Sequence, residues 1–412
     1  MDHIILNIKA LIFKLLIMSL LVATGSCREE SFSPSETDSF IKFFGHHGIY
    51  EAVGVITLDG GGYLLAGNTL TDTTGSNIIL IYTDKFGNET GSAKHFGGVY
   101  DDRANTIISL SDGGFAILGS TTVNGDGGSL VTNMYLIRTD SNGDELWTKN
   151  YGELSGNETG YSLAETRDGG FVLLGSTEIS QTGKKNIFMV KTDAEGESEG
   201  VGNWTRIHGG FDDDNVGYGI AETEYGYIYT GYTRRYSQSG PSDTDILIYK
   251  TNSRGHVFMP ATYDNRGDDI GKLIIPHPEG GYLILGTTSN PLTNIQNIYL
   301  SHIEEDILSN PAWTRSFGGS TSHVATCMKI TPEGNYVITG TQVLTDQNQA
   351  VFLLKTDPEG NEIFFNTYGG SGRQRAQSVD LTPDGGYIIV GSSETGDASM
   401  ITLIKTDANG EL

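Results

Sequence analysis

The sequence predicts an all-β protein, because one short motif recurs through it at a nearly fixed spacing. In its second copy the motif reads Asp-Gly-Gly-Phe-Ala-Ile-Leu-Gly-Ser-Thr over residues 112–121. The aromatic residue after the glycines occurs seven times, 51 to 56 residues apart, as Tyr63, Phe115, Phe171, Tyr227, Tyr282, Tyr336 and Tyr387. A repeat of this length is typical of rings and arrays built from one supersecondary unit. The composition agrees: 56 Gly, only 10 Pro and 37% apolar residues suit short strands joined by tight turns.

Within one repeat the sequence predicts four short antiparallel strands. Residues 105–110 and 115–122 are rich in β-branched and apolar side chains, and the Asp-Gly between them suggests a two-residue hairpin. A Gly-rich loop then leads to a third predicted strand over residues 134–139. The turn Asp-Ser-Asn-Gly, in which Asp caps the backbone and Gly takes a positive φ, leads to a fourth over residues 145–151. Four antiparallel strands in about fifty residues is the pattern of a β-propeller blade.

The two ends of the chain predict how the ring of blades closes. The seventh repeat stops at Leu412, after its third strand, and so lacks a fourth. Residues 39–45, Ser-Phe-Ile-Lys-Phe-Phe-Gly, have the pattern of a fourth strand that belongs to no repeat. If this strand completes the last blade, it locks the ring and leaves no blade with an unpaired inner edge. We therefore predict a seven-bladed propeller over residues 39–412, closed by its N-terminal strand.

Residues 1–26 have the composition of a secretory signal peptide. Two lysines precede an apolar run over residues 15–23, which is too short to span a bilayer and ends in small residues. The small residues followed directly by Cys27 resemble the lipobox of bacterial lipoproteins. This resemblance implies that the Cys27 thiol is acylated and that Cys27 becomes the mature N-terminus, although Thr24 departs from the usual aliphatic residue. An ordinary secretory signal with an incidental cysteine is the alternative.

Residues 27–38 predict a flexible tether, since they are polar, contain Pro34 and lack periodicity. Arg28-Glu29-Glu30 resembles the acidic signal that directs some Bacteroidota lipoproteins to the outer face of the outer membrane. A solvated linker has the same composition. The expected location is therefore the outer membrane, with a lipid anchor, on the cell surface or the periplasmic face.

The repeat as a whole also carries a resemblance. The order Asp-Gly-Gly-Phe/Tyr, then Lys/Arg-Thr-Asp-x-x-Gly, then Trp and Tyr-Gly-Gly resembles repeats of secreted and lipid-anchored propellers of bacteria and archaea. The resemblance covers residues 39–412 and implies the fold. It implies no activity, because propellers host many unrelated functions.

The charge balance narrows the range of partners. The formal net charge is −25, which argues against binding to nucleic acid and against electrostatic docking on anionic lipid. The two cysteines, Cys27 and Cys327, do not make a disulfide framework, and Cys327 is expected to be a buried small hydrophobe.

Strand polarity places the variable connections on one face of the predicted propeller. The long loops expected after the second strands are residues 70–77, 123–133, 178–186, 234–245, 289–297 and 343–349. Variable loops on a rigid scaffold often carry binding sites. We therefore expect this face to contact the partner.

Acidic residues at the crossings between repeats form the first candidate site. They are Asp101 and Asp102, Asp212 and Asp214, and Asp268 and Asp269. Such crossings approach the mouth of a propeller channel, so these carboxylates could converge on Ca²⁺. The segment from Asp212 to Gly217 resembles the start of a calcium loop, but it lacks the later oxygen ligands. Local turn capping by Asp is the alternative.

A second candidate site lies in the fourth repeat, at Tyr232, Arg234, Arg235 and Tyr236. Two aromatic rings and two guanidiniums could stack on a sugar, hold a carboxylate or anchor a protein partner. An ordinary exposed loop is the alternative. The repeat aromatics, together with Trp147, Trp204 and Trp313, are instead expected to pack between blades.

Enzyme motifs are missing from the sequence. It contains no Gly-x-Ser-x-Gly, no His-Glu-x-x-His, no Walker loop and no dinucleotide fingerprint. We therefore expect a binding or scaffold module for a protein or glycan of the cell envelope. The alternative is a glycan-cleaving enzyme, such as a sialidase-like propeller, with a carboxylate pair at the channel mouth.

Overall fold

The computed structural model describes residues 39–45, 48–71, 75–153, 156–179, 182–210, 213–237, 240–264, 267–345, 347–369, 372–396 and 398–412. These residues belong to one compact unit, Asp38–Leu412. The predicted signal peptide, Cys27 and the tether lie outside the described residues. In the part of the chain that is described, no helix is long and apolar enough to cross a membrane.

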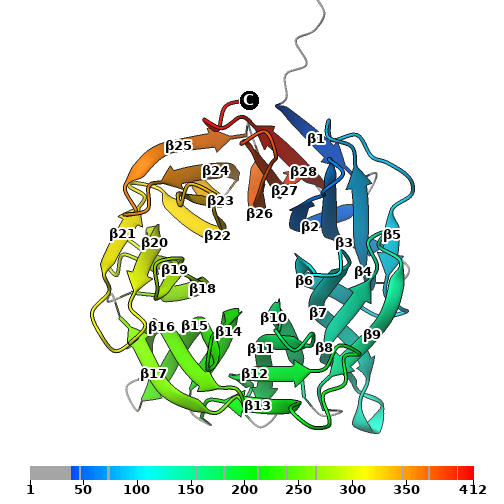
Figure 1. Ribbon diagram of the computed structural model, residues 1–412, viewed down its shortest axis with the longest axis vertical. Helices are drawn as coiled ribbons and strands as arrows, with labels where there is room; N and C mark the ends of the chain where they lie inside the picture. Colours follow the sequence, from blue (N-terminus) through cyan, green and yellow to red (C-terminus); the bar gives the residue numbers. More distant parts are fainter. Residues whose placement is uncertain are drawn as a thin grey trace, which may run out of the picture. The chain divides into compact units, whose positions relative to one another are not determined.

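Antiparallel strands surround a central opening in Figure 1. One four-stranded sheet contains β6 (Asp102–Ser109), β7 (Phe115–Asn124), β8 (Leu130–Thr139) and β9 (Glu145–Tyr151), with the short 3₁₀ helix η1 (Asp126–Gly128) between β7 and β8. The next contains β10 (Glu158–Glu165), β11 (Phe171–Ile179), β12 (Lys184–Thr192) and β13 (Trp204–His208). A third contains β14 (Asp214–Glu222), β15 (Gly226–Ser237), β16 (Gly240–Asn252) and β17 (Val257–Tyr263). A fourth contains β18 (Asp269–Pro276), β19 (Tyr282–Ser289), β20 (Gln296–Ile303) and β21 (Trp313–Phe317).

The other described strands belong to one continuous network of pairing. The first repeat of the chain contributes β2 (Ile49–Thr57), β3 (Tyr63–Thr71), β4 (Gly75–Thr83) and β5 (Lys94–Phe96) to this network. The sixth repeat contributes β22 (Ser322–Ile330), β23 (Tyr336–Thr345), β24 (Asn348–Thr356) and β25 (Glu362–Tyr368). The seventh repeat contributes β26 (Arg373–Leu381), β27 (Tyr387–Thr395) and β28 (Ala398–Thr406), and β1 (Phe40–Phe44) pairs with β28. The protein is thus an all-β propeller with four-stranded antiparallel blades, as the repeat predicts.

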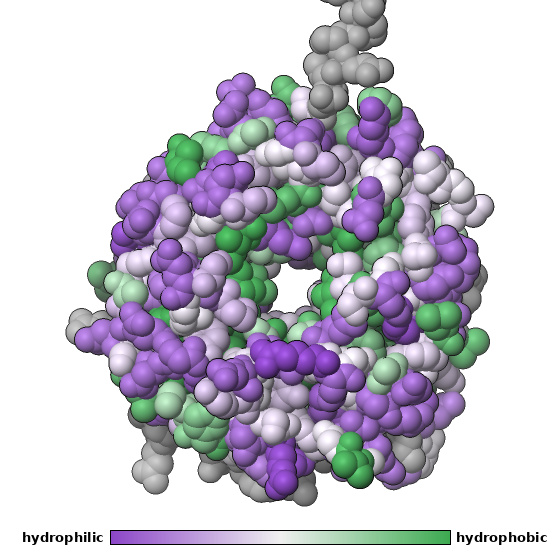
Figure 2. All heavy atoms as spheres, in the orientation of Figure 1, coloured by the Kyte–Doolittle hydropathy of each residue, from purple (hydrophilic) through white to green (hydrophobic). Residues whose placement is uncertain are grey.

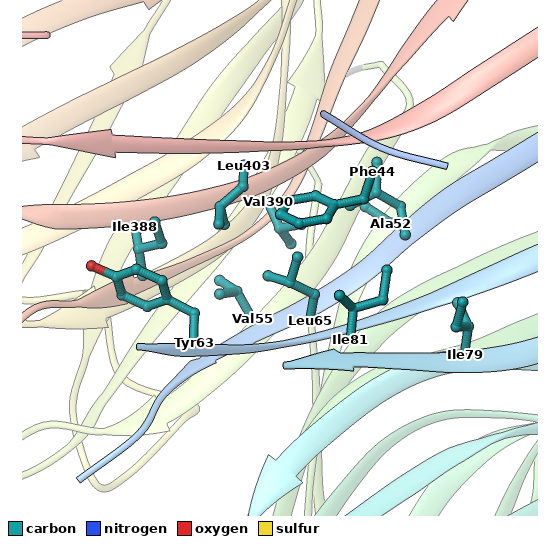
Figure 3. Close-up of a cluster of buried hydrophobic side chains, with 11 residues drawn as sticks. Phe44, Ala52, Val55, Tyr63, Leu65, Ile79, Ile81, Ile388, Val390 and Leu403 are labelled. Carbon is teal, nitrogen blue, oxygen red and sulfur yellow. The ribbon is translucent and has the colours of Figure 1, made fainter. Parts of the chain in front are cut away.

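The two ends of the described chain lie side by side. Strand β1 pairs with β28 in antiparallel register, from Phe40 opposite Lys405 to Phe44 opposite Ile401. The Ser399 hydroxyl of β28 also accepts the backbone N–H of Tyr50 in β2, at 3.1 Å. Figure 3 shows the apolar cluster beneath these strands, which combines side chains from β1 to β4 with side chains from β27 and β28.

The Asp-Gly-Gly turn is longer than the two-residue hairpin that the sequence predicts. In the second repeat the carbonyl of Leu110 accepts the N–H of Gly113, and the N–H of Leu110 donates to the carbonyl of Gly114, both at 2.9 Å. Gly113 takes a φ of +87°, and the Asp112 carboxylate accepts the N–H of Gly114 at 3.0 Å. The positive φ was predicted correctly, but the two-residue loop was wrong because Asp caps a wider turn.

The turn aspartate also explains why Lys or Arg recurs in the third strand. The pairs are Asp112 with Arg138, Asp168 with Lys191, and Asp384 with Lys405. The cationic side chains are at most 8% exposed, whereas the carboxylates remain 42–65% exposed. The stem of each cationic side chain is therefore buried, and its charged group pairs with the carboxylate at the turn.

Asp168→Asn is expected to lower the free energy of unfolding by about 1–2 kcal/mol at neutral pH, because Lys191 loses its counter-ion while almost buried. Burial acts to raise the pKa of Asp168, but hydrogen bonds from Thr166 and Lys191 outweigh it and hold the pKa below its usual value. The pair therefore stabilises the fold above about pH 4 and ceases to do so as pH falls through the depressed value. Urea titrations at pH 7 and pH 3 measure this, and the difference from wild type should shrink in acid. The control, Asp59→Asn, removes an exposed carboxylate for which the structure shows no ion pair; an equal effect there would contradict the prediction.

Aromatic side chains of the outer strands pack on the repeat aromatic of the next blade, which confirms the predicted blade-to-blade role. The ring centroids are 6.0 Å apart for Trp147 and Phe171, 5.7 Å for Trp204 and Tyr227, 6.1 Å for Trp313 and Tyr336, 6.3 Å for Phe364 and Tyr387, and 6.3 Å for Phe40 and Tyr63. Phe40 of β1 thus packs on the first blade as a tryptophan does elsewhere. Cys327, predicted to be buried, packs against the core but stays partly exposed.

The predicted long loops are shorter than expected, because the second and third strands keep pairing. Strands β15 and β16 pair as far as Ser237 and Gly240, inside the predicted loop 234–245. Strands β23 and β24 likewise pair as far as Thr345 and Asn348. This face of the propeller therefore carries extended hairpins in place of several loops.

Candidate binding site at the channel mouth

One residue from the inner strand of each repeat lines the central channel. In every inner strand the pairing with the second strand shifts register by one residue, which is the mark of a β-bulge. The bulged residues are Val53, Asn105, Tyr161, Tyr218, Lys272, Thr326 and Gln377, and all of them line the same cavity. A bulge re-aims a side chain without ending the strand, so the repeat presents one variable residue per blade to the channel.

Small residues make this bulge possible. The residue before each bulge is Ala or Gly, and it lies opposite a glycine of the second strand, as Gly160 lies opposite Gly175. A Cβ built on Gly175 would lie 1.8 Å from the carbonyl oxygen of Thr159. Only glycine lets the two backbones approach this closely.

The channel opens into a cavity of about 680 Å³. Its walls include the bulged residues, the start of β2 and the hairpin between β27 and β28. It therefore lies toward the face that carries the second-to-third-strand hairpins. Figure 2 shows an opening at the centre of the molecule, bordered by both hydrophilic and hydrophobic residues. The volume is in the range of about 300–1,000 Å³ that is usual for small-ligand sites.

Paired charges occupy one side of the cavity. Glu51 forms an ion pair with Arg103 from the next blade. Glu394 lies 3.3 Å from an Nη of Arg373 and 3.4 Å from an Nη of Arg375. Both carboxylates that line this cavity are thus neutralised by guanidiniums.

Tyrosine rings and one lysine occupy the other side. The rings of Tyr161 and Tyr218 are 5.0 Å apart and tilted by 59°. The Lys272 ammonium lies 3.8 Å from the centroid of the Tyr218 ring, a cation–π contact. Burial lowers the pKa of Lys272 to about 8 and raises the pKa of Tyr218.

The acidic residues predicted for calcium hold neighbouring blades together. Carboxylate oxygens of Asp101, Asp214 and Asp268 accept backbone N–H groups at the start of the preceding blade's third strand, at 2.8, 2.8 and 2.9 Å. Asp102 is buried and accepts the N–H of Gly98 at 2.6 Å, and Asp269 is fully buried. The observed contacts are capping bonds. Those of Asp101, Asp214 and Asp268 cap the neighbouring blade, and that of Asp102 caps its own turn.

The structure does not bring the acidic pairs together. Among the described residues, no group of three or more His, Cys, Asp or Glu side chains could hold a metal ion. Asp212 lies outside the described residues. The calcium site therefore stays a prediction, without a ligand cluster in the described part of the chain.

The residues of the second candidate site also separate. Tyr232 packs behind the channel wall, with its ring 6.1 Å from that of Tyr218. Arg234 donates to Asp268 at 3.2 Å, Arg235 is exposed, and the side chain of Tyr236 is outside the described residues. Side chains alternate between the two faces of β15, so Arg235 lies on the opposite face from Tyr232 and Arg234, and the two arginines do not form one surface.

Sequence reasoning missed the channel residues, although a signal for them exists. The bulged residue stands ten positions before the repeat aromatic in six repeats and nine before it in the fourth, as Tyr161 stands before Phe171. Its predecessor is Ala or Gly in every copy, whereas the bulged position itself varies freely. A small residue before a variable one, facing a fixed glycine, is the pattern that identifies the site.

Comparison with known proteins assigns the chain to no family. No family model matches the chain, and no curated protein matches it. It is similar to the β-propeller domain of the Trilobed protease from Pyrococcus furiosus, at a TM-score of 0.49 and 12% identity over 90% of this chain and 96% of that one. It is also similar to YCF48 from Cyanidioschyzon merolae (TM-score 0.48, 8% identity, 88% and 98% covered) and to an endo-arabinase from Bacteroides thetaiotaomicron VPI-5482 (0.34, 13%, 61% and 95%). Likeness at this level concerns the fold alone.

Proposed function

We propose that this protein is a lipid-anchored, extracytoplasmic β-propeller that binds a glycan at its channel mouth. The observation that carries the proposal is the cavity of about 680 Å³, which combines tyrosine rings with amide, hydroxyl and guanidinium groups. Aromatic faces stack on sugar rings, and the polar groups can hydrogen-bond to sugar hydroxyls.

Binding fits the cavity better than cleavage does. A glycosidase needs a carboxylic acid and a carboxylate held at a fixed separation across the sugar. Glu51 and Glu394, the carboxylates that line the cavity, are both engaged by arginines. Neither carboxylate is therefore free to take one of these two roles.

We also infer that the ring has seven blades and that β1 completes the last of them. The seven repeats support this count. The pairing of β1 with β28 and the packing of Phe40 on Tyr63 support the closure. A closed ring fixes the diameter of the channel and so keeps the cavity walls in place.

Tyr161→Ala tests the location of the site. We expect binding of a responsive oligosaccharide, first found by screening a glycan array with the full chain, to weaken at least tenfold when this ring is removed. Tyr225→Ala removes a tyrosine that is 68% exposed and lies in the turn between β14 and β15, and it should bind as wild type does. If both variants keep full affinity, the ligand does not bind in the channel.

Cys27→Ser tests the anchor. The variant is expected to move from the membrane fraction to the soluble fraction of the cell envelope, since an acylated cysteine is the proposed membrane attachment. Fractionation and immunoblotting measure this. Retention of the variant in the membrane would contradict the lipid anchor.

A further inference from the structure

We propose that the ligand of the channel cavity carries a carboxylate, and that the ammonium group of Lys272 binds it. This inference rests on the proposed function and names the class of glycan, one that contains acidic sugars. It assigns to Lys272 the role of a specificity-determining residue.

The first support is the charge balance inside the cavity. The cavity is lined by five ionised side chains: Glu51, Arg103, Arg375, Glu394 and Lys272. The first four are joined in ion pairs within or beside the cavity. Among the described residues, Lys272 has no carboxylate partner, and its observed contact is the ring of Tyr218. A ligand carboxylate would supply the missing counter-ion.

The second support is the position of Lys272. It is a bulged residue in β18, so its backbone is fixed by pairing on either side of the bulge. Gly271, its predecessor, could not be larger, because an added Cβ would lie 2.1 Å from the Thr230 hydroxyl oxygen. The bulge fixes the root of the side chain, and the contact with the Tyr218 ring positions the ammonium group. This placement in advance lowers the entropic cost of binding.

The third support is the burial of Lys272, which brings its pKa to about 8. A partly desolvated ammonium interacts with a carboxylate more strongly than a fully hydrated one does. The Tyr161 ring lies beside the Tyr218–Lys272 pair and offers an apolar face to the sugar. Charge and stacking surface thus occur together on one wall.

The matched test uses two carboxylated probes, a galacturonate trisaccharide and sialyllactose, and two neutral counterparts, a galactose trisaccharide and lactose. Calorimetric titration of the full-length protein in detergent should show at least tenfold tighter binding of one carboxylated probe than of its neutral counterpart. Lys272→Met should abolish this preference, and Lys272→Arg should restore part of it. Thermal unfolding of each variant checks that it is folded.

Lys85→Met is the control. The Lys85 ammonium also lies over an aromatic ring, 4.6 Å from the centroid of Phe86, but at the exposed turn after β4. This variant loses the same charge and the same kind of contact outside the cavity. It should keep the wild-type preference for the carboxylated probe.

A pH series on the wild type tests the inference without a variant. The groups around Lys272 are the phenols of Tyr161, Tyr218 and Tyr232, and across the cavity the two ion pairs of Glu51 with Arg103 and Glu394 with Arg375. As pH rises through about 8, Lys272 loses its proton, so affinity for the carboxylated probe should fall toward that of the neutral one.

The outcomes separate the two proposals. The wild type could bind neutral and carboxylated probes with equal affinity, and Lys272→Met could bind them with that same affinity. In that case the glycan site stands and the role of Lys272 is overturned. If the wild type binds none of the four probes but binds a neutral glycan of the array, the glycan site stands and the inference is overturned. If it binds no glycan of the array either, the glycan site is overturned as well. A preference that survives in Lys272→Met places carboxylate recognition elsewhere and also overturns the inference.

Discussion

Gly175→Ala is expected to destabilise the propeller by about 3 kcal/mol, because no space exists for one added methyl group. The built Cβ would lie 1.8 Å from the Thr159 carbonyl oxygen and 2.9 Å from the Cα of Gly160. Both neighbours are backbone atoms of the inner strand, so no side chain can rotate away. The strands must separate, which disrupts their hydrogen bonds and the bulge that holds Tyr161 in the channel.

Gly210→Ala is the matched control. A Cβ at Gly210 would have no heavy atom of the described residues within 4 Å, and the residue has no positive φ. Chemical denaturation followed by tryptophan fluorescence should show a large loss of stability for Gly175→Ala and almost none for Gly210→Ala. Equal stabilities would mean that the two strands do not approach as closely as the structure shows.

The sequence predicts the blades well because their signals are local. The turn residue Gly113 takes the positive φ that its place after Asp112 predicts, and the outer strand Glu145–Tyr151 has the predicted bounds. The hairpins were harder to predict. Residues 234–237 are polar, yet they remain in β15 because β16 pairs with Arg234, Tyr236 and Ser237 around a bulge at Arg235. Pairing between strands outweighs the local preference for a loop.

The site was not predictable in the same way, because it depends on which side chains meet across blades. Asp101 and Asp268 were expected to converge on a cation, but each caps the backbone of the blade that precedes it. Tyr161, Tyr218 and Lys272 are more than fifty residues apart in sequence. They meet because each occupies the same bulged position in consecutive blades. Their common position becomes visible only when the seven repeats are aligned with one another on the repeat aromatic.

Phe44→Ala tests the inferred closure of the ring by β1. Phe44 is 7% exposed and belongs to a cluster that includes Leu65 of β3 and Val390 of β27. Figure 3 shows its ring among side chains from both ends of the chain. Truncating a buried phenylalanine costs about 3–5 kcal/mol. The lost stability should come mainly from the contact between the first and the last repeat.

Phe43→Ala changes the neighbouring residue of the same strand, which is 54% exposed, and should cost less than about 1 kcal/mol. Hydrogen exchange adds a local measurement, because β1 and β28 share backbone hydrogen bonds between Phe40–Phe44 and Ile401–Lys405. In Phe44→Ala these amides should exchange faster than those of β11 and β12, on the far side of the ring. Uniform acceleration in all blades would instead indicate that the propeller unfolds as one unit from any point. An unchanged rate in β28 would show that β1 does not complete the last blade, and the inferred seven-bladed closure would fail with it.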